Sequence, residues 1–319
     1  MRLFDKEGST PLSDINPFIY TSCWASFNLR LVRQNKYRRD YHVEFPVVSA
    51  KYYPGSEMAS GEYFEPRKKG KAPLAILIHG WGDHSVLPLK WMVDGLIKRG
   101  IACFILYLPF HSSRLPENKT NLSELTDDEW FVGYQMAVTD VRQIIDWANQ
   151  NSQINHQKIS IIALSLGAIV SSIAMGIDRR IKAAVFITLG GNTGKIMQTN
   201  SISRFGNKYR LPQETYLQNQ RNYAKYLIEV DDKGFENVEP TQRTYLIDPL
   251  TYAAKLKGRP VLMINASWDE LFPRDTSLEF QRACGCELVT FPATHAGIWI
   301  WYPLITRNIN RFLKTSLAD

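Results

Sequence analysis

The chain has 319 residues, enough for one large α/β domain with an insertion. Its hydrophobic fraction of 45%, charged fraction of 22% and formal net charge of +7 are typical of an ordinary globular protein. The longest apolar run, residues 101–110, is far too short to span a bilayer, and the N-terminus has no apolar signal-peptide core.

Cysteine and basic residues point to a cytoplasmic protein without a metal site. The Cys-Gly-Cys at 284–286 is too tight for zinc, so the four cysteines predict reduced thiols in the cytoplasm. The one dense basic run, residues 67–71, predicts a solvated loop and not a nucleic-acid site. No Rossmann glycine pattern, P-loop or metal-ligand cluster is present, which predicts no cofactor and no metal. The sequence leaves the oligomeric state open.

The N-terminal part predicts an extension followed by antiparallel strands. Residues 1–40 form the expected extension, with some helix at 25–34. From Tyr41 the pattern changes to alternation between apolar and polar residues, which predicts a half-exposed strand. A second short strand is expected at 61–64, and the pair would open the sheet.

Strands and helices then alternate along the chain. Thr126 and Glu129 form a predicted capping box that opens a long helix. Repetition of strand and helix with short connections predicts a doubly wound, mostly parallel sheet. The expected strands are 74–79, 101–108, 159–163, 183–189, 260–265 and 287–291, and the expected helices are 86–98, 126–149, 248–257, 277–282 and 302–317.

Residues 192–245 interrupt this alternation and predict a helical lid. The segment is polar, with a candidate helix at 214–228 and no clear strand. Its aromatic residues fit a lid over an apolar cleft or a small core of the lid itself, and both interpretations stay open. The core domain is then expected at 41–191 and 246–319. The lid aromatics are Phe205, Tyr209, Tyr216, Tyr223 and Tyr226.

The sequence Ala-Leu-Ser-Leu-Gly at 163–167 predicts a nucleophile. A buried strand would turn abruptly at Ser165 into a helix, which exposes the hydroxyl at the tip of the turn. Small residues flank such a turn because neighbouring elements crowd it. The amides that follow, beginning with Leu166, lie at a helix N-terminus and favour negative charge.

A base and a carboxylate are expected after the last two strands. His295 follows the strand at 287–291 directly, whereas the other five histidines precede the serine. Asp269 follows the strand at 260–265 and would face the His295 loop. Asp269 is preferred to Glu270 because backbone amides can hold a short side chain at this turn.

Further site residues are expected at the same sheet edge. The backbone amides of Trp81, in the His-Gly-Trp-Gly at 79–82, and of Leu166 are the predicted oxyanion donors. His111, Arg114 and Trp299 are candidate substrate contacts. Structural loop contacts are the favoured alternative for His111 and Arg114, and packing of the last helix is the favoured alternative for Trp299.

Over nearly all of residues 60–319 the sequence resembles the α/β-hydrolase superfamily, most closely its esterase, dienelactone-hydrolase and prolyl-oligopeptidase-like branch. The motifs at 79–82 and 163–167, with Asp269 and His295 at strand ends, carry this resemblance; Ala163 replaces the first glycine of the usual G-x-S-x-G. The resemblance implies an α/β-hydrolase fold and a Ser165–Asp269–His295 triad.

The predicted function is a serine carboxylic-ester hydrolase of the esterase or deacetylase type, which acts on a small-to-medium acyl ester or an acetylated substrate through an acyl-enzyme. One alternative is a serine peptidase of the prolyl-oligopeptidase type, although no propeller-sized N-terminal domain is seen and only Glu62 and Glu65 offer an acidic pair. The other is a ligand-binding protein without turnover, which would need none of the three triad residues.

Overall fold

The computed structural model describes residues 16–22, 26–48, 56–111, 114–115, 119, 122–199 and 209–318. Residues 1–15 of the predicted extension and Phe205 of the predicted lid lie outside these ranges. Cys103, Cys284 and Cys286 are buried thiols without disulfide bonds.

A single nine-stranded sheet organises the described part of the chain, in the spatial order β1-β2-β3-β5-β4-β6-β7-β8-β9. The first three strands pair antiparallel, as does β3 with β5, and every other neighbouring pair is parallel. The strands are β1 Asn28–Gln34, β2 Arg38–Pro46, β3 Met58–Pro66, β4 Ala72–Ile78, β5 Ala102–Leu106, β6 Ile154–Leu164, β7 Ile181–Ile187, β8 Val261–Ala266 and β9 Glu287–Phe291.

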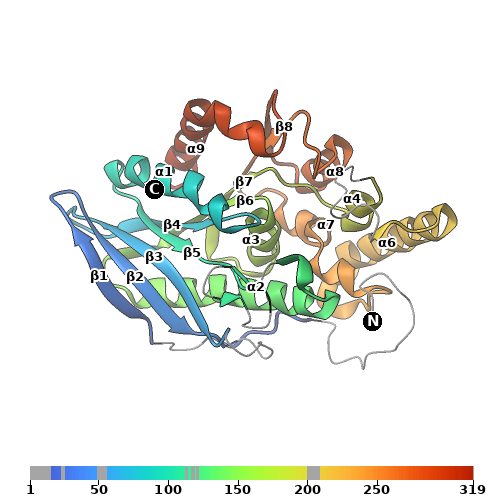
Figure 1. The fold of residues 1–319 in the computed structure, drawn as a ribbon, viewed down its shortest axis with the longest axis horizontal. Helices are drawn as coiled ribbons and strands as arrows, with labels where there is room; N and C mark the ends of the chain where they lie inside the picture. Colours follow the sequence, from blue (N-terminus) through green and yellow to red (C-terminus); the bar gives the residue numbers. More distant parts are fainter. Residues whose placement is uncertain are drawn as a thin grey trace.

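Helices cover both faces of the sheet, which confirms the predicted doubly wound architecture (Figure 1). Helices α1 and α9 lie on one face, and α2, α3, α7 and α8 lie on the other. The α-helices are α1 Leu87–Lys98, α2 Asp127–Gln150, α3 Leu166–Ile177, α4 Thr193–Thr199, α6 Gln213–Lys233, α7 Pro249–Ala253, α8 Arg274–Cys284 and α9 Tyr302–Ser316.

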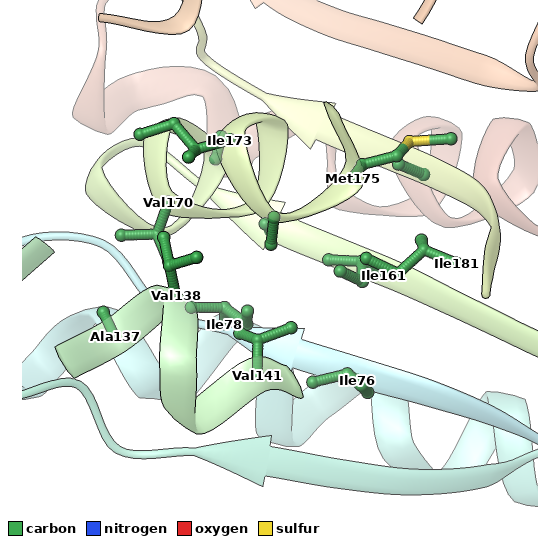
Figure 2. Packing of buried hydrophobic residues seen from close by; sticks show 14 of the residues in the cluster. Ile76, Ile78, Ala137, Val138, Val141, Ile161, Val170, Ile173, Met175 and Ile181 are labelled. Carbon is green, nitrogen blue, oxygen red and sulfur yellow. The ribbon is translucent and has the colours of Figure 1, made fainter. Parts of the chain in front are cut away.

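The central strands are buried on both faces because successive side chains point in opposite directions. On β6, Ile161 packs with α2 and α3, whereas Ile162 packs with α1 and α9. Figure 2 shows the cluster that contains α2 and α3, to which Ile76 and Ile78 of β4 and Val141 of α2 all belong. Helix α2 begins with the predicted capping box between Thr126 and Glu129. The continuous apolar runs of the sequence therefore become the centre of the sheet.

The predicted helix at 25–34 is wrong, because the chain forms strand β1 there. This strand lies at the edge of the sheet and pairs antiparallel with β2. Its side chains are mostly exposed, among them Leu31 and Val32. Leu29 packs on the core but the other side chains of β1 are exposed, so burial gives the strand no alternating pattern and its structure depends mainly on the pairing with β2.

In its described residues the segment 192–245 contains the α-helices α4 and α6, and the predicted helix at 214–228 lies within α6. Tyr223 and Tyr226 are buried and pack with Tyr245; the ring centroids of Tyr223 and Tyr245 are 4.4 Å apart. All three belong to the hydrophobic cluster that contains α2 and α3. These tyrosines are therefore core residues of the molecule.

Candidate active site

Ser165 occupies a strained turn between β6 and α3. Its backbone has φ 50° and ψ −114°, a conformation that costs a residue with a side chain about 1–3 kcal/mol. Hydrogen bonds on both sides hold it: the Ser165 amide donates to the Ile187 carbonyl of β7 at 2.9 Å, and the Ser165 carbonyl accepts from the Ala168 amide at 2.8 Å. The sheet and the helix together impose the turn that presents the hydroxyl.

Gly167 allows α3 to begin directly against the end of β4. A Cβ atom at this position would lie 2.5 Å from the carbonyl oxygens of Ile78 and His79. The turn after β4 is equally close to the serine, because a Cβ on Gly80 would lie 3.2 Å from the Ser165 Cβ. The small residues around Ser165 therefore bring the ends of β4 and β6 together.

The turn after β4, which contains Trp81, is fixed by His79. The Leu108 amide donates to His79 Nε2 at 3.0 Å, so Nδ1 carries the ring proton and donates to the Gly80 carbonyl at 2.7 Å. The Ser85 hydroxyl lies 2.5 Å from the Gly82 carbonyl oxygen. Burial lowers the pKa of His79 to about 3, and the ring stays neutral. The sequence alone does not predict that His79 holds this turn. The feature that could have indicated it is the position of His79 immediately before Gly80.

Trp81 and Leu166 lie on the two sides of this junction. Leu166 is the first residue of α3, and the first amides of a helix have no acceptor within the helix. The Trp81 ring packs against Trp130, with centroids 4.8 Å apart. Trp81 thus follows Gly80, which lies close to Ser165, and Leu166 follows Ser165 itself.

His295 connects the serine with a carboxylate. Its Nε2 lies 3.1 Å from Ser165 Oγ, and its Nδ1 lies 2.9 Å from Asp269 Oδ2. An ionised carboxylate only accepts hydrogen bonds, so Nδ1 donates to Asp269 and Nε2 accepts from the serine hydroxyl. The amides of Leu271 and Phe272 donate to Asp269 Oδ1 at 2.9 and 2.8 Å. The Asp269 side chain is 1% exposed and the His295 side chain 13%.

Arg114 is buried in an ion pair with Asp140. Its Nη1 donates to Asp140 Oδ2 of α2 and to the Tyr107 carbonyl, both at 2.8 Å. Burial raises the pKa of Asp140, and the guanidinium of Arg114 opposes this shift. The pair ties the loop after β5 to α2, which corresponds to the structural alternative for this residue.

His111 and Trp299 also pack within the protein. The His111 ring is buried, with its centroid 4.9 Å from that of His79, and its Nδ1 lies 2.9 Å from the Pro109 carbonyl oxygen. Trp299 is half-buried and packs on the cluster that contains α1 and α9. These positions favour packing for both side chains over the predicted contact with a substrate.

A hollow beside α6 is separate from this constellation. It is lined by polar and aromatic residues, among them Asn192, Tyr216, Gln220, Thr244 and Asp248, and by neither Ser165 nor His295. In the described ranges, no group of three His, Cys, Asp or Glu side chains is placed to hold a metal ion. Nor does any helix in these ranges have the length and apolarity needed to cross a membrane.

Several solved structures share this fold at low sequence identity. An acetyl xylan esterase from Paenibacillus sp. R4 is 14% identical with a TM-score of 0.66, over 97% of this chain and 100% of that one. A cold-adapted esterase from an Arctic intertidal metagenomic library is 16% identical with a TM-score of 0.59, over 92% and 100%. Acylaminoacyl peptidase from Pyrococcus horikoshii is 16% identical with a TM-score of 0.60, over 88% of this chain and 42% of that one.

A search among curated proteins gave no significant match. The family described as "Alpha/beta hydrolase domain containing 18" matches residues 33–296, most of the chain and all three residues of the Ser165–His295–Asp269 hydrogen-bond series. This match agrees with the sheet order, the strained serine turn and the strand-end positions of the histidine and the carboxylate. The chain belongs to the family of α/β-hydrolase domain containing 18 proteins.

Proposed function

We propose that this protein is a serine hydrolase that cleaves carboxylic esters through an acyl-enzyme intermediate. The observation that carries the proposal is the series of two hydrogen bonds from Ser165 through His295 to Asp269, at 3.1 and 2.9 Å. A neutral histidine between a hydroxyl and a buried carboxylate is the arrangement that activates a serine for attack on an acyl carbon.

In the first half of the reaction, Ser165 Oγ forms a bond to the acyl carbon while His295 Nε2 takes the hydroxyl proton. Asp269 holds the histidine tautomer and stabilises the resulting imidazolium. The negative charge on the former carbonyl oxygen is stabilised by the amides of Leu166 and Trp81. Loss of one such donor typically costs about 3 kcal/mol of barrier. Collapse of the intermediate expels the alcohol, which receives the proton from His295.

In the second half, water replaces the alcohol. The oxygen of the water attacks the acyl carbon while His295 removes a proton from the water. A second tetrahedral intermediate forms, and its collapse breaks the bond between the acyl carbon and Ser165 Oγ. The serine recovers its proton from His295, and the carboxylic acid leaves. The overall reaction consumes one water for each ester bond cleaved.

An ester is favoured over a peptide by the surroundings of the two glutamates of β3. Glu62 Oε1 accepts from Lys90 Nζ at 2.7 Å, and Glu65 Oε2 lies 3.3 Å from Arg39 Nη1. Both carboxylates are thus neutralised by side chains of the protein, and neither is available as the acidic group that would hold a peptide amine. Esterases and an acylaminoacyl peptidase are both among the structural neighbours, so the choice of an ester depends on these two glutamates.

The test combines p-nitrophenyl esters, aminoacyl anilides and a fluorophosphonate probe with Ser165→Ala. We expect ester cleavage and labelling in the natural protein and loss of both in the variant. Ser172→Ala is the matched control, because this hydroxyl lies on the same helix and donates to the Ile169 carbonyl. Ester cleavage that survives Ser165→Ala would refute the mechanism. Preferred cleavage of anilides would favour the peptidase, and a folded protein that never labels would favour a binding protein.

A further inference from the structure

A second carboxylate contacts His295 from the same loop as Asp269. The backbone amide of His295 donates to Glu270 Oε2 at 2.8 Å. Asp269 accepts from the ring of this histidine, and Glu270 accepts from its main chain. Consecutive residues after β8 therefore hold the side chain and the backbone of one residue.

The other hydrogen bonds of the loop that carries His295 involve its neighbours, among them Gly297 N to Thr294 Oγ1 at 3.1 Å. Two backbone hydrogen bonds continue the pairing of β8 with β9 past the strand ends: Ser267 donates to Phe291 at 2.8 Å, and Trp268 donates to Ala293 at 3.0 Å. This backbone pairing stops two residues before His295. The flanking residues at 294, 296 and 297 are exposed, and His295 is the first residue before a short 3₁₀ helix.

The His295 ring is held at Nδ1 by Asp269 and packs beside Phe272, with ring centroids 5.6 Å apart. Contacts to the ring alone would leave the main chain of His295 able to shift, which would move Nε2 relative to Ser165 Oγ. A second contact at the backbone amide removes this freedom, because the Cα atom is then fixed as well. Hydrogen bonds to an ionised carboxylate are shorter and about twice as strong as those between neutral groups.

We propose that Glu270 is a positioning residue that keeps His295 Nε2 at the serine by accepting the His295 backbone amide. The proposal rests on the proposed function of His295 as the base. Glu270 acts through His295 and contributes an acceptor, so a neutral side chain with an oxygen at the same place should replace it.

The test compares Glu270→Ala, which removes the acceptor, with Glu270→Gln, which keeps an amide oxygen of similar reach. A displacement of about 1 Å at a reacting group can cost about 100-fold in rate. We expect Glu270→Ala to lower kcat by about 10- to 100-fold with KM changed less than about twofold, and Glu270→Gln to recover kcat to within about threefold of the natural protein. Glu287→Ala is the matched control, because this exposed glutamate at the start of β9 only pairs with Arg311.

Melting temperatures of all variants separate positioning from folding. The proposal is supported if Glu270→Ala has the same melting temperature as the Glu287→Ala control but a lower kcat, and if Glu270→Gln recovers kcat. Unchanged kcat in Glu270→Ala would overturn it, and so would an equal loss of kcat in Gln and Ala or a loss explained by a lower melting temperature. Turnover that survives Ser165→Ala would remove the proposed function itself, and the positioning role with it.

Discussion

Replacement of Gly167 by alanine should separate α3 from the end of β4. The added Cβ would lie 2.5 Å from two main-chain oxygens, whereas ordinary contacts begin at 3.4 Å, so the helix or the strand must move by about 0.9 Å. Overpacking of this kind costs up to about 3 kcal/mol, and the better helix propensity of alanine returns about 1 kcal/mol. We therefore expect a net loss of about 2 kcal/mol in unfolding free energy.

The same movement should impair ester hydrolysis more than it impairs stability. A shift of α3 carries Ser165 and the Leu166 amide away from the turn that contains Trp81, and a displacement of about 1 Å can reduce kcat by about 100-fold. Gly95→Ala in α1 is the control, since its new Cβ would meet only Arg99 Nη1 at 3.9 Å. That variant should gain about 0.5–1 kcal/mol with unchanged kcat. Urea unfolding and ester turnover measure both effects; a Gly167→Ala protein as stable and active as Gly95→Ala would refute this reasoning.

Two further predictions concern buried ionisable groups. The pKa of His79 is about 3 in the folded protein and about 6.5 unfolded, so unfolding near pH 5 takes up about one proton, and stability falls as the pH is lowered through this window. His79→Asn should reduce this slope by about 1.4 kcal/mol per pH unit in urea titrations, and an unchanged slope would contradict the assignment. Arg114→Met should cost about 3–5 kcal/mol at neutral pH, because it leaves the Asp140 charge buried and unpaired. Without Arg114 the pKa of Asp140 rises further above its already raised value, so this cost should shrink as the pH falls from neutral towards about 4, and a pH-independent cost would argue against a buried charge.

The parts of the fold that the sequence predicts are those with a local pattern. The strand at 287–291 was predicted with the bounds of β9, and the capping box of Thr126 was predicted at its observed position. Both depend on residues close together in the chain: an apolar run after a glycine turn, and a hydroxyl three residues before a glutamate. The prediction failed at strand β1 because the structure of this strand depends on pairing with residues 5 to 16 positions further along the chain, and little on burial.

Within the candidate site, the sequence indicates which residues follow strand ends but not what each one contacts. Asp269 was preferred to Glu270 because a short carboxylate can be held by backbone amides, and the Leu271 and Phe272 amides do bind it. The contact of Glu270 with the His295 backbone crosses between loops 25 residues apart, and no spacing reveals it. The burial of Arg114 against Asp140 is equally invisible, because both residue types are usually exposed.

The unusual backbone of Ser165 also bears on heat inactivation. A conformation that is unfavourable for serine persists only while its neighbours enforce it, and the bond from the Ser165 amide to Ile187 is one of the restraints. Strands β6 and β7 are buried in the middle of the sheet, and strands in such a position open only with the whole domain. The Ser165 turn should therefore keep its shape up to the melting temperature, so that loss of activity on warming and loss of structure are expected to coincide.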